Sequence, residues 1–188
     1  MVSGAKFIEE YANMSAEQRI DYISKSYSTF MGAVESHTEG LLYMIEEEQD
    51  FKRRQEKGDL GVRVQGGKTI SDKTATTAIR NVSIRDAIET CNFSDGLLDD
   101  VDHADMYISM AETLRRMRRD YRLFNSQIAN LSASDAVLIK VFMNKEKDLY
   151  EIANELGLTY DSARQKVRRI RYDLKNKTLQ FISGSYFG

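Results

Sequence analysis

The sequence predicts an all-α protein, with a helical N-terminal bundle or coiled-coil part followed by a C-terminal trihelical domain. Three observations support this. The 188 residues contain no proline. Strong helix formers such as Ala, Glu, Lys, Arg, Met and Leu are abundant. Apolar residues recur at spacings of three and four over long stretches, while strand-like alternation is rare.

The first fifty residues are expected to form a short amphipathic segment after Ser3, with Phe7, Ile8 and Tyr11 packing, and then one long helix. The stretch Ser15-Ala-Glu-Gln18 has the signature of a capping box. The apolar seam of the long helix consists of Ile20, Ile23, Tyr27, Phe30, Val34, His37, Leu41 and Met44. Such a seam is typical of a coiled coil or of one wall of a bundle. It must be buried against residues 72–130 or against a second subunit.

The Gly-rich stretch 58–72 interrupts the helical pattern. A small hairpin and a flexible linker both remain open for it. Gly67-Lys68-Thr69 ends like a phosphate-binding loop, but Val62 stands where the first glycine of that motif is required. Nucleotide binding is therefore not expected.

A helix capped by Ser71 or Asp72 should follow and extend to Cys91. Its predicted inward residues are Ala75, Ile79, Val82 and Ala87. Cys91 has no neighbouring Cys or His ligand, so we expect a small core residue rather than a nucleophile or zinc ligand.

A second long helix is predicted from Leu97 to Ile128. Its predicted inward residues are Val101, Ile108, Ala111, Leu114, Tyr121, Phe124 and Ile128. The acidic stretch 95–105 around His103 fits a solvated helix start better than a metal site, because no second histidine is nearby. Five arginines decorate the helix and could meet either DNA phosphates or the acidic first half; they are Arg115, Arg116, Arg118, Arg119 and Arg122.

The C-terminal part, residues 131–182, has the pattern of three short helices. Ser132 or Ser134 should begin the first, whose predicted core is Val137, Leu138, Val141 and Phe142. In the second, the apolar face is Leu149, Ile152, Ala153 and Leu156. Gly157 suits a left-handed helix end, Leu158 is expected as a buried plug, and Thr159 is a good N-cap for the third helix. The buried stripe of that helix is predicted to be Ala163, Val167, Ile170 and Leu174. This is the pattern of a helix-turn-helix.

Two resemblances accompany these patterns. The stretch EIANELGLTYDSARQKVRRIRYDL resembles the promoter-reading C-terminal domain of bacterial sigma factors, with Ala163 where Val or Ile is usual. The phrase TISDKTATTAIRN, placed before a long helix and this domain, resembles the late-gene transcriptional regulators of phages, the ArpU and RinA type, with Lys73 replacing a proline. Together they imply a sequence-specific, double-stranded DNA-binding regulator, an activator of phage or mobile-element genes acting with RNA polymerase.

The third helix would then lie in the major groove. Its N-terminal cap and first turn bring Thr159, Tyr160 and Ser162 to the interface. Ser162, Arg164, Gln165 and Arg168 are candidates for base edges, and Lys166, Arg169, Arg171 and Lys175 for phosphates. A single recognition helix reads few base pairs, which favours a homodimer held by the seam.

Charge and composition agree with this expectation. Residues 1–110 hold 12 Lys and Arg against 20 Asp and Glu, whereas residues 111–188 hold 15 against 9, so nucleic acid would meet only the C-terminal part. A single cysteine, no signal peptide and no membrane-length apolar run predict a cytoplasmic protein with no membrane partner. No catalytic group, cofactor or metal site is expected. The alternatives are a divergent sigma factor, a phage DNA-packaging (small terminase-like) or replication-initiation protein, and a protein–protein adaptor that no longer binds DNA.

Overall fold

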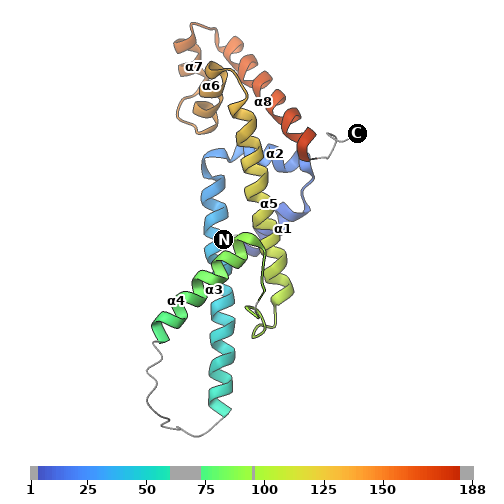
Figure 1. Cartoon of the computed structure of the whole chain (residues 1–188). Coiled ribbons are helices and arrows are strands. Elements are labelled where there is room, and N and C mark those ends of the chain that lie inside the picture. Colours follow the sequence, from blue (N-terminus) through green and yellow to red (C-terminus); the bar gives the residue numbers. More distant parts are fainter. Residues whose placement is uncertain (1–3, 60–72, 95, 183–188) are drawn as a thin grey trace. The chain divides into compact units, whose positions relative to one another are not determined.

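The computed structural model describes residues 4–59, 73–94 and 96–182, and these ranges contain eight helices and no strand (Figure 1). The helices are α1 (Gly4–Asn13), α2 (Ala16–Lys25), α3 (Tyr27–Asp59), α4 (Lys73–Thr90), α5 (Ala104–Ala129), α6 (Ala133–Met143), α7 (Leu149–Leu156) and α8 (Tyr160–Ile182). The predicted all-α class is thus confirmed. None of the described helices combines the length and apolarity that crossing a bilayer requires.

The chain folds into two compact units. The first unit contains Met1–Glu9 and Glu35–Arg115, and the second contains Glu10–Val34 and Arg116–Gly188. The division falls inside α1, α3 and α5. It differs from the boundary expected near residue 130, because α2 packs against α8 and thereby joins the C-terminal helices.

In the first unit, the carboxylate of Glu48 on α3 forms hydrogen bonds with the turn that precedes α5 and with the first residues of α5. Glu48 accepts hydrogen bonds from the hydroxyl of Tyr107 (2.5 Å) and from the backbone amide of Asp102 (2.5 Å). Its Oε2 also lies 3.1 Å from Nδ1 of His103. Burial raises the pKa of Glu48, but these hydrogen bonds outweigh it and lower the pKa to about 2. Gln49 donates to the carbonyl of Leu97 (2.7 Å). The turn is therefore held by polar contacts from one face of α3.

In the second unit, aromatic rings fill the space between α1, α2, α3 and α5. The ring of Phe30 lies 6.0 Å from that of Tyr11, 6.1 Å from Tyr22 and 5.6 Å from Tyr121. The buried Asp120 accepts from Tyr11 Oη (3.0 Å) and from Arg19 Nε (2.7 Å). Burial and the neighbouring carboxylate both raise the pKa of Tyr11, so its hydroxyl keeps its proton.

The predicted seam is buried, but within the chain. Ile20, Ile23, Phe30, Val34 and Leu41 are each at most 1% exposed in the single chain. Tyr27 is also buried, while His37 and Met44 are half-buried. The ring of His37 stacks on Phe7 at 4.6 Å, and burial lowers the pKa of its imidazole. A second subunit is not needed to cover this stripe, so the seam no longer argues for a dimer.

Two expected helices begin or break elsewhere. The long N-terminal helix is interrupted at Ser26, whose backbone (φ −107°, ψ 18°) ends α2 and whose hydroxyl donates to the carbonyl of Tyr22 (2.7 Å). The helix expected from Leu97 begins only at Ala104, because the preceding residues form turns held by Glu48. The capping box at Ser15 is confirmed.

The inward residues predicted for α4 are confirmed at Ala87 but wrong at Ile79 and Val82. Ile79 is 68% exposed and Val82 61% exposed, whereas Ile84, Ala87 and Ile88 are buried. Spacings of three and four link the buried residues, and that stripe runs along a different side of the helix from Ile79 and Val82.

Cys91 also departs from its predicted place in the core. It is half-buried and takes a left-handed backbone (φ 54°) directly after the last residue of α4. It is therefore the residue at which this helix ends.

Three predictions fall on residues outside the described ranges. They are the hairpin or linker of residues 60–72, the helix cap at Ser71 or Asp72, and the C-terminal tail 183–188. The side chain of Ala75 is likewise not described. Gly58 and Asp59, at the edge of the Gly-rich stretch, belong to α3.

Candidate nucleic-acid interface

The turn between α7 and α8 has the expected helix-turn-helix geometry. Gly157 adopts a left-handed conformation (φ 61°), and the amide of Leu158 donates to the carbonyl of Ala153 (2.9 Å) to close α7. Thr159 Oγ1 accepts from the amide of Ser162 (3.2 Å) and so caps α8. At the other end of α7, Asp148 forms a capping box with Glu151, which was not predicted from the sequence. Both helices therefore have fixed ends.

The apolar stripe of α8 is buried as predicted. Ala163, Val167, Ile170 and Leu174 are at most 4% exposed. Because the stripe fixes the rotation of the helix, the opposite residues must face outward. The exposed residues of the first half and middle of α8 are Tyr160, Asp161, Ser162, Arg164, Gln165, Arg168, Arg169 and Tyr172. Six of them, all but Asp161 and Tyr172, are among the predicted site residues.

The other basic residues predicted to touch phosphates have partners inside the chain. Lys166 forms an ion pair with Asp135 of α6 (3.1 Å), and this contact lowers the pKa of the carboxyl. Arg171 Nε donates to Ser24 Oγ (3.1 Å). These contacts fasten α8 to α6 and α2.

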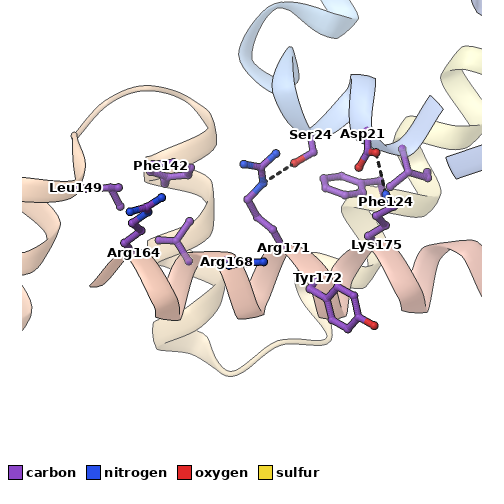
Figure 2. Close-up of a pocket in the computed structure, with 12 residues that line it drawn as sticks. Asp21, Ser24, Phe124, Phe142, Leu149, Arg164, Arg168, Arg171, Tyr172 and Lys175 are labelled. Carbon is purple, nitrogen blue, oxygen red and sulfur yellow. Dashed lines mark hydrogen bonds and ion pairs between the residues drawn. The ribbon is translucent and has the colours of Figure 1, made fainter. Parts of the chain in front are cut away.

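Lys175 contacts two carboxylates of α2 at once. Its ammonium lies 2.8 Å from Asp21 and 2.7 Å from Glu17, both on α2. The hydrogen bonds to Asp21 and then Glu17 raise the pKa of Lys175, which keeps it charged. Figure 2 shows Arg171 and Lys175 reaching toward α2, while Tyr172 projects from the other side of α8. The C-terminal half of α8 is thus a docking segment rather than a free basic surface.

A cleft of about 390 Å³ lies alongside α8 and is lined by residues of α2, α5, α6, α7 and α8 (Figure 2). Arg164 and Arg168 line it from α8, with Phe142 of α6 and Leu149 of α7 nearby. Asp21 and Ser24 close the side formed by α2. Arg164 and Arg168 form no hydrogen bond or ion pair with any residue that the structure describes. Their guanidinium groups are free to meet an anionic ligand.

Tyr150 is an exposed residue of this surface that was not predicted from the sequence. It is 65% exposed at the start of α7, and its ring lies 4.5 Å from that of Tyr160. The signal was available, because Tyr150 falls outside the apolar stripe of Leu149, Ile152 and Ala153. The pair of rings marks the point where the N-terminal ends of α7 and α8 meet.

Three apolar residues of the helix-turn-helix are less buried than predicted. Val137 is 63% exposed, Leu156 43% and Leu158 38%. In α6 the predicted Leu138 is buried, together with Ile139 and Met143, while Val141 and Phe142 are half-buried. Val137 and Leu156 line an open cleft of about 430 Å³ between α6 and α7, so no described element covers them. Leu158 is therefore not the plug that the sequence indicated.

Comparison of the chain with protein-family models, with curated proteins and with solved structures finds no match in any of the three. The described residues also contain no group of three or more His, Cys, Asp or Glu side chains able to hold a metal ion. The candidate interface accordingly rests on the geometry of α7 and α8.

Proposed function

We propose that the chain is a sequence-specific regulator of transcription that binds double-stranded DNA through the N-terminal half of α8. The observation that carries the proposal is the division of α8 along its length. Residues 160–169 expose arginine, glutamine, serine and tyrosine side chains, while Lys175 and Arg171 fasten the rest of the helix to α2. A rigidly held helix with an exposed face of this chemistry suits the major groove.

The roles of the exposed residues follow from their chemistry. Arg164 and Arg168 can each make two hydrogen bonds to guanine, and Gln165 can do the same with adenine. Arg169 is exposed on the same helix and suits a phosphate. Lys166 already pairs with Asp135, so we assign it to positioning α8.

The regulator is proposed to act in the cytoplasm and with RNA polymerase, on genes of a phage or mobile element. This part of the proposal rests on the resemblance of the TISDKTATTAIRN phrase and the C-terminal domain described above. A homodimer that uses two half-sites remains part of the proposal, but its interface would lie outside the seam of α2 and α3, which is already buried.

Selection from a randomised duplex library, followed by gel shifts on the selected site, tests DNA binding. Arg168→Ala should weaken specific binding by about 1–3 kcal/mol, as expected for the loss of one base or close phosphate contact. Arg54→Ala is the matched control, because Arg54 is an exposed arginine on α3. Failure to enrich any sequence, or equal affinities of the Arg168 variant and the unmodified protein, would contradict the proposal.

Transcription from a supercoiled template carrying the selected site separates a regulator from a sigma factor. A regulator should stimulate polymerase that already carries a sigma factor and be silent with the core enzyme alone. Transcription by the core enzyme plus this chain would identify a sigma factor instead.

A further inference from the structure

A second basic cleft lies at the far end of α8, within the second unit. Its volume is about 500 Å³, and arginines from α2 and α5 surround it: Arg19, Arg116, Arg119 and Arg122. One carboxylate, Asp120, also lines it. Four arginines against one aspartate give the cleft a clear positive excess.

The aspartate does not neutralise the outer arginines. Asp120 is 6% exposed, and its Oδ2 accepts from both Arg19 Nε (2.7 Å) and Tyr11 Oη (3.0 Å). Arg116 and Arg119 are exposed and form no hydrogen bond or ion pair with a residue that the structure describes. The same holds for Arg122. The cleft therefore presents three guanidinium groups to an external anion.

The remaining wall of the cleft is apolar. Leu123 of α5 and Phe181 and Ile182 of α8 supply it, and Phe181 is 43% exposed. A small inorganic anion or a nucleic-acid backbone would pair with the arginines and leave this wall uncovered. A peptide that alternates carboxylates with an apolar side chain matches both parts, because planar guanidinium groups bind carboxylates through two parallel hydrogen bonds.

The cleft is separate from the proposed DNA-binding face. Phe181 follows Arg164 by 17 residues, which places it about 25 Å farther along the helix axis. It also follows the buried Leu174 by seven residues, so it lies on the inner side of α8 rather than beside Gln165. A duplex against the outer face of the first half of α8 would not fill this space.

We propose that this arginine cleft binds an acidic peptide segment of a partner protein. Carboxylates of the segment pair with Arg116, Arg119 and Arg122, and one apolar side chain of the segment packs on Leu123 and Phe181. The site goes beyond DNA binding, because it gives the chain a protein contact that does not compete with the DNA-binding face.

The test uses the full chain and a fluorescein-labelled peptide of Glu and Asp residues with a central Leu-Phe pair, followed by fluorescence anisotropy. The double variant Arg116→Gln, Arg119→Gln should bind this peptide roughly tenfold or more weakly, since two charge-assisted contacts are lost. The matched control is Arg164→Gln, Arg168→Gln, which removes the same charge from the DNA-binding face and should leave peptide affinity unchanged. Circular dichroism checks that both variants fold.

Two further arms identify the ligand chemistry. A peptide with Ser-Ser in place of Leu-Phe should bind more weakly, and inorganic polyphosphate should displace the labelled peptide only at high concentration. No binding, equal losses in the two double variants, or equal affinity of the two peptides would overturn the proposal. Duplex binding by the Arg116, Arg119 double variant should stay intact, so a failure of the peptide site is distinguishable from a failure of the DNA-binding proposal.

Discussion

Replacing Phe30 by alanine should remove a large part of the folding free energy of the second unit. The ring is 1% exposed and has the rings of Tyr11, Tyr22 and Tyr121 within 5.6–6.1 Å. Truncating a buried Phe to Ala costs about 3–5 kcal/mol. Three aromatic neighbours favour the upper end of that range, since each such pair adds about 0.5–1.5 kcal/mol.

Urea unfolding followed by circular dichroism, at low and high protein concentration, measures this loss. Phe51→Ala is the matched control: the same substitution on the same helix, at a residue that is 58% exposed. Its effect should stay within about 0.5 kcal/mol. The midpoint of the unmodified protein should not depend on concentration, because the seam around Phe30 is covered by its own chain.

Two results would refute this reasoning. A loss below about 1 kcal/mol for Phe30→Ala would mean that the ring is not packed as described. A midpoint that rises with protein concentration, and does so less in the variant, would mean that a second subunit covers the seam.

Affinity for the selected duplex should fall steeply as salt rises, because Lys and Arg displace counterions from DNA; a flat plot of log affinity against log salt in gel shifts would contradict duplex binding. Glu48→Gln should destabilise the protein by on the order of 2–3 kcal/mol at neutral pH, given a pKa lowered from 4.5 to about 2. The difference from the unmodified protein should shrink as pH falls from 4.5 toward 2, since the unfolded chain takes up the proton first; urea titrations across this range would show it, and a difference independent of pH would contradict it. Gly157→Ala should cost about 1–2 kcal/mol from its left-handed backbone alone, as nothing lies within 4 Å of the added methyl. Gly40→Ala, inside α3 with equal space, should instead stabilise by about 0.5–1 kcal/mol; thermal melts that give both variants the same sign would refute the distinction.

Local patterns predicted much of the fold. The buried stripe of Ala163, Val167 and Ile170 could be predicted from the sequence. A helix that packs on one side only carries its apolar residues at spacings of three and four, and this spacing is visible in the sequence. The helix caps at Ser15 and Thr159 could also be predicted, because each cap hydrogen bond joins residues only three apart in the sequence.

Long-range partners were not predictable in this way. Lys175 and Asp21 are 154 residues apart, and Arg171 and Ser24 are 147 apart. Nothing in the local sequence distinguishes a basic residue whose side chain pairs with another helix from one whose side chain is available to bind a ligand such as DNA. Three of the residues predicted to contact DNA, Lys166, Arg171 and Lys175, therefore have side chains that already pair within the chain.

Ile79 and Val137 were predicted to be buried but are exposed. The error arose because an apolar residue on an amphipathic helix can belong to either of two neighbouring stripes of the helix surface. Which stripe is buried depends on the elements that pack against it, and those come from distant parts of the chain. For α4 the buried side is that of Ile84 and Ile88.

The continuity of α8 has a mechanical consequence. Its 23 residues form one unbroken rod, about 35 Å long at 1.5 Å per residue. Lys175, which holds this rod to Asp21 and Glu17, lies 15 residues beyond Tyr160, a separation of about 22 Å. A tilt of about 5° at that attachment would carry the Tyr160 end through about 2 Å, enough to break a base contact of ordinary hydrogen-bond length. The carboxylates of α2 thus hold one end of a lever whose other end is the turn that we propose to face DNA.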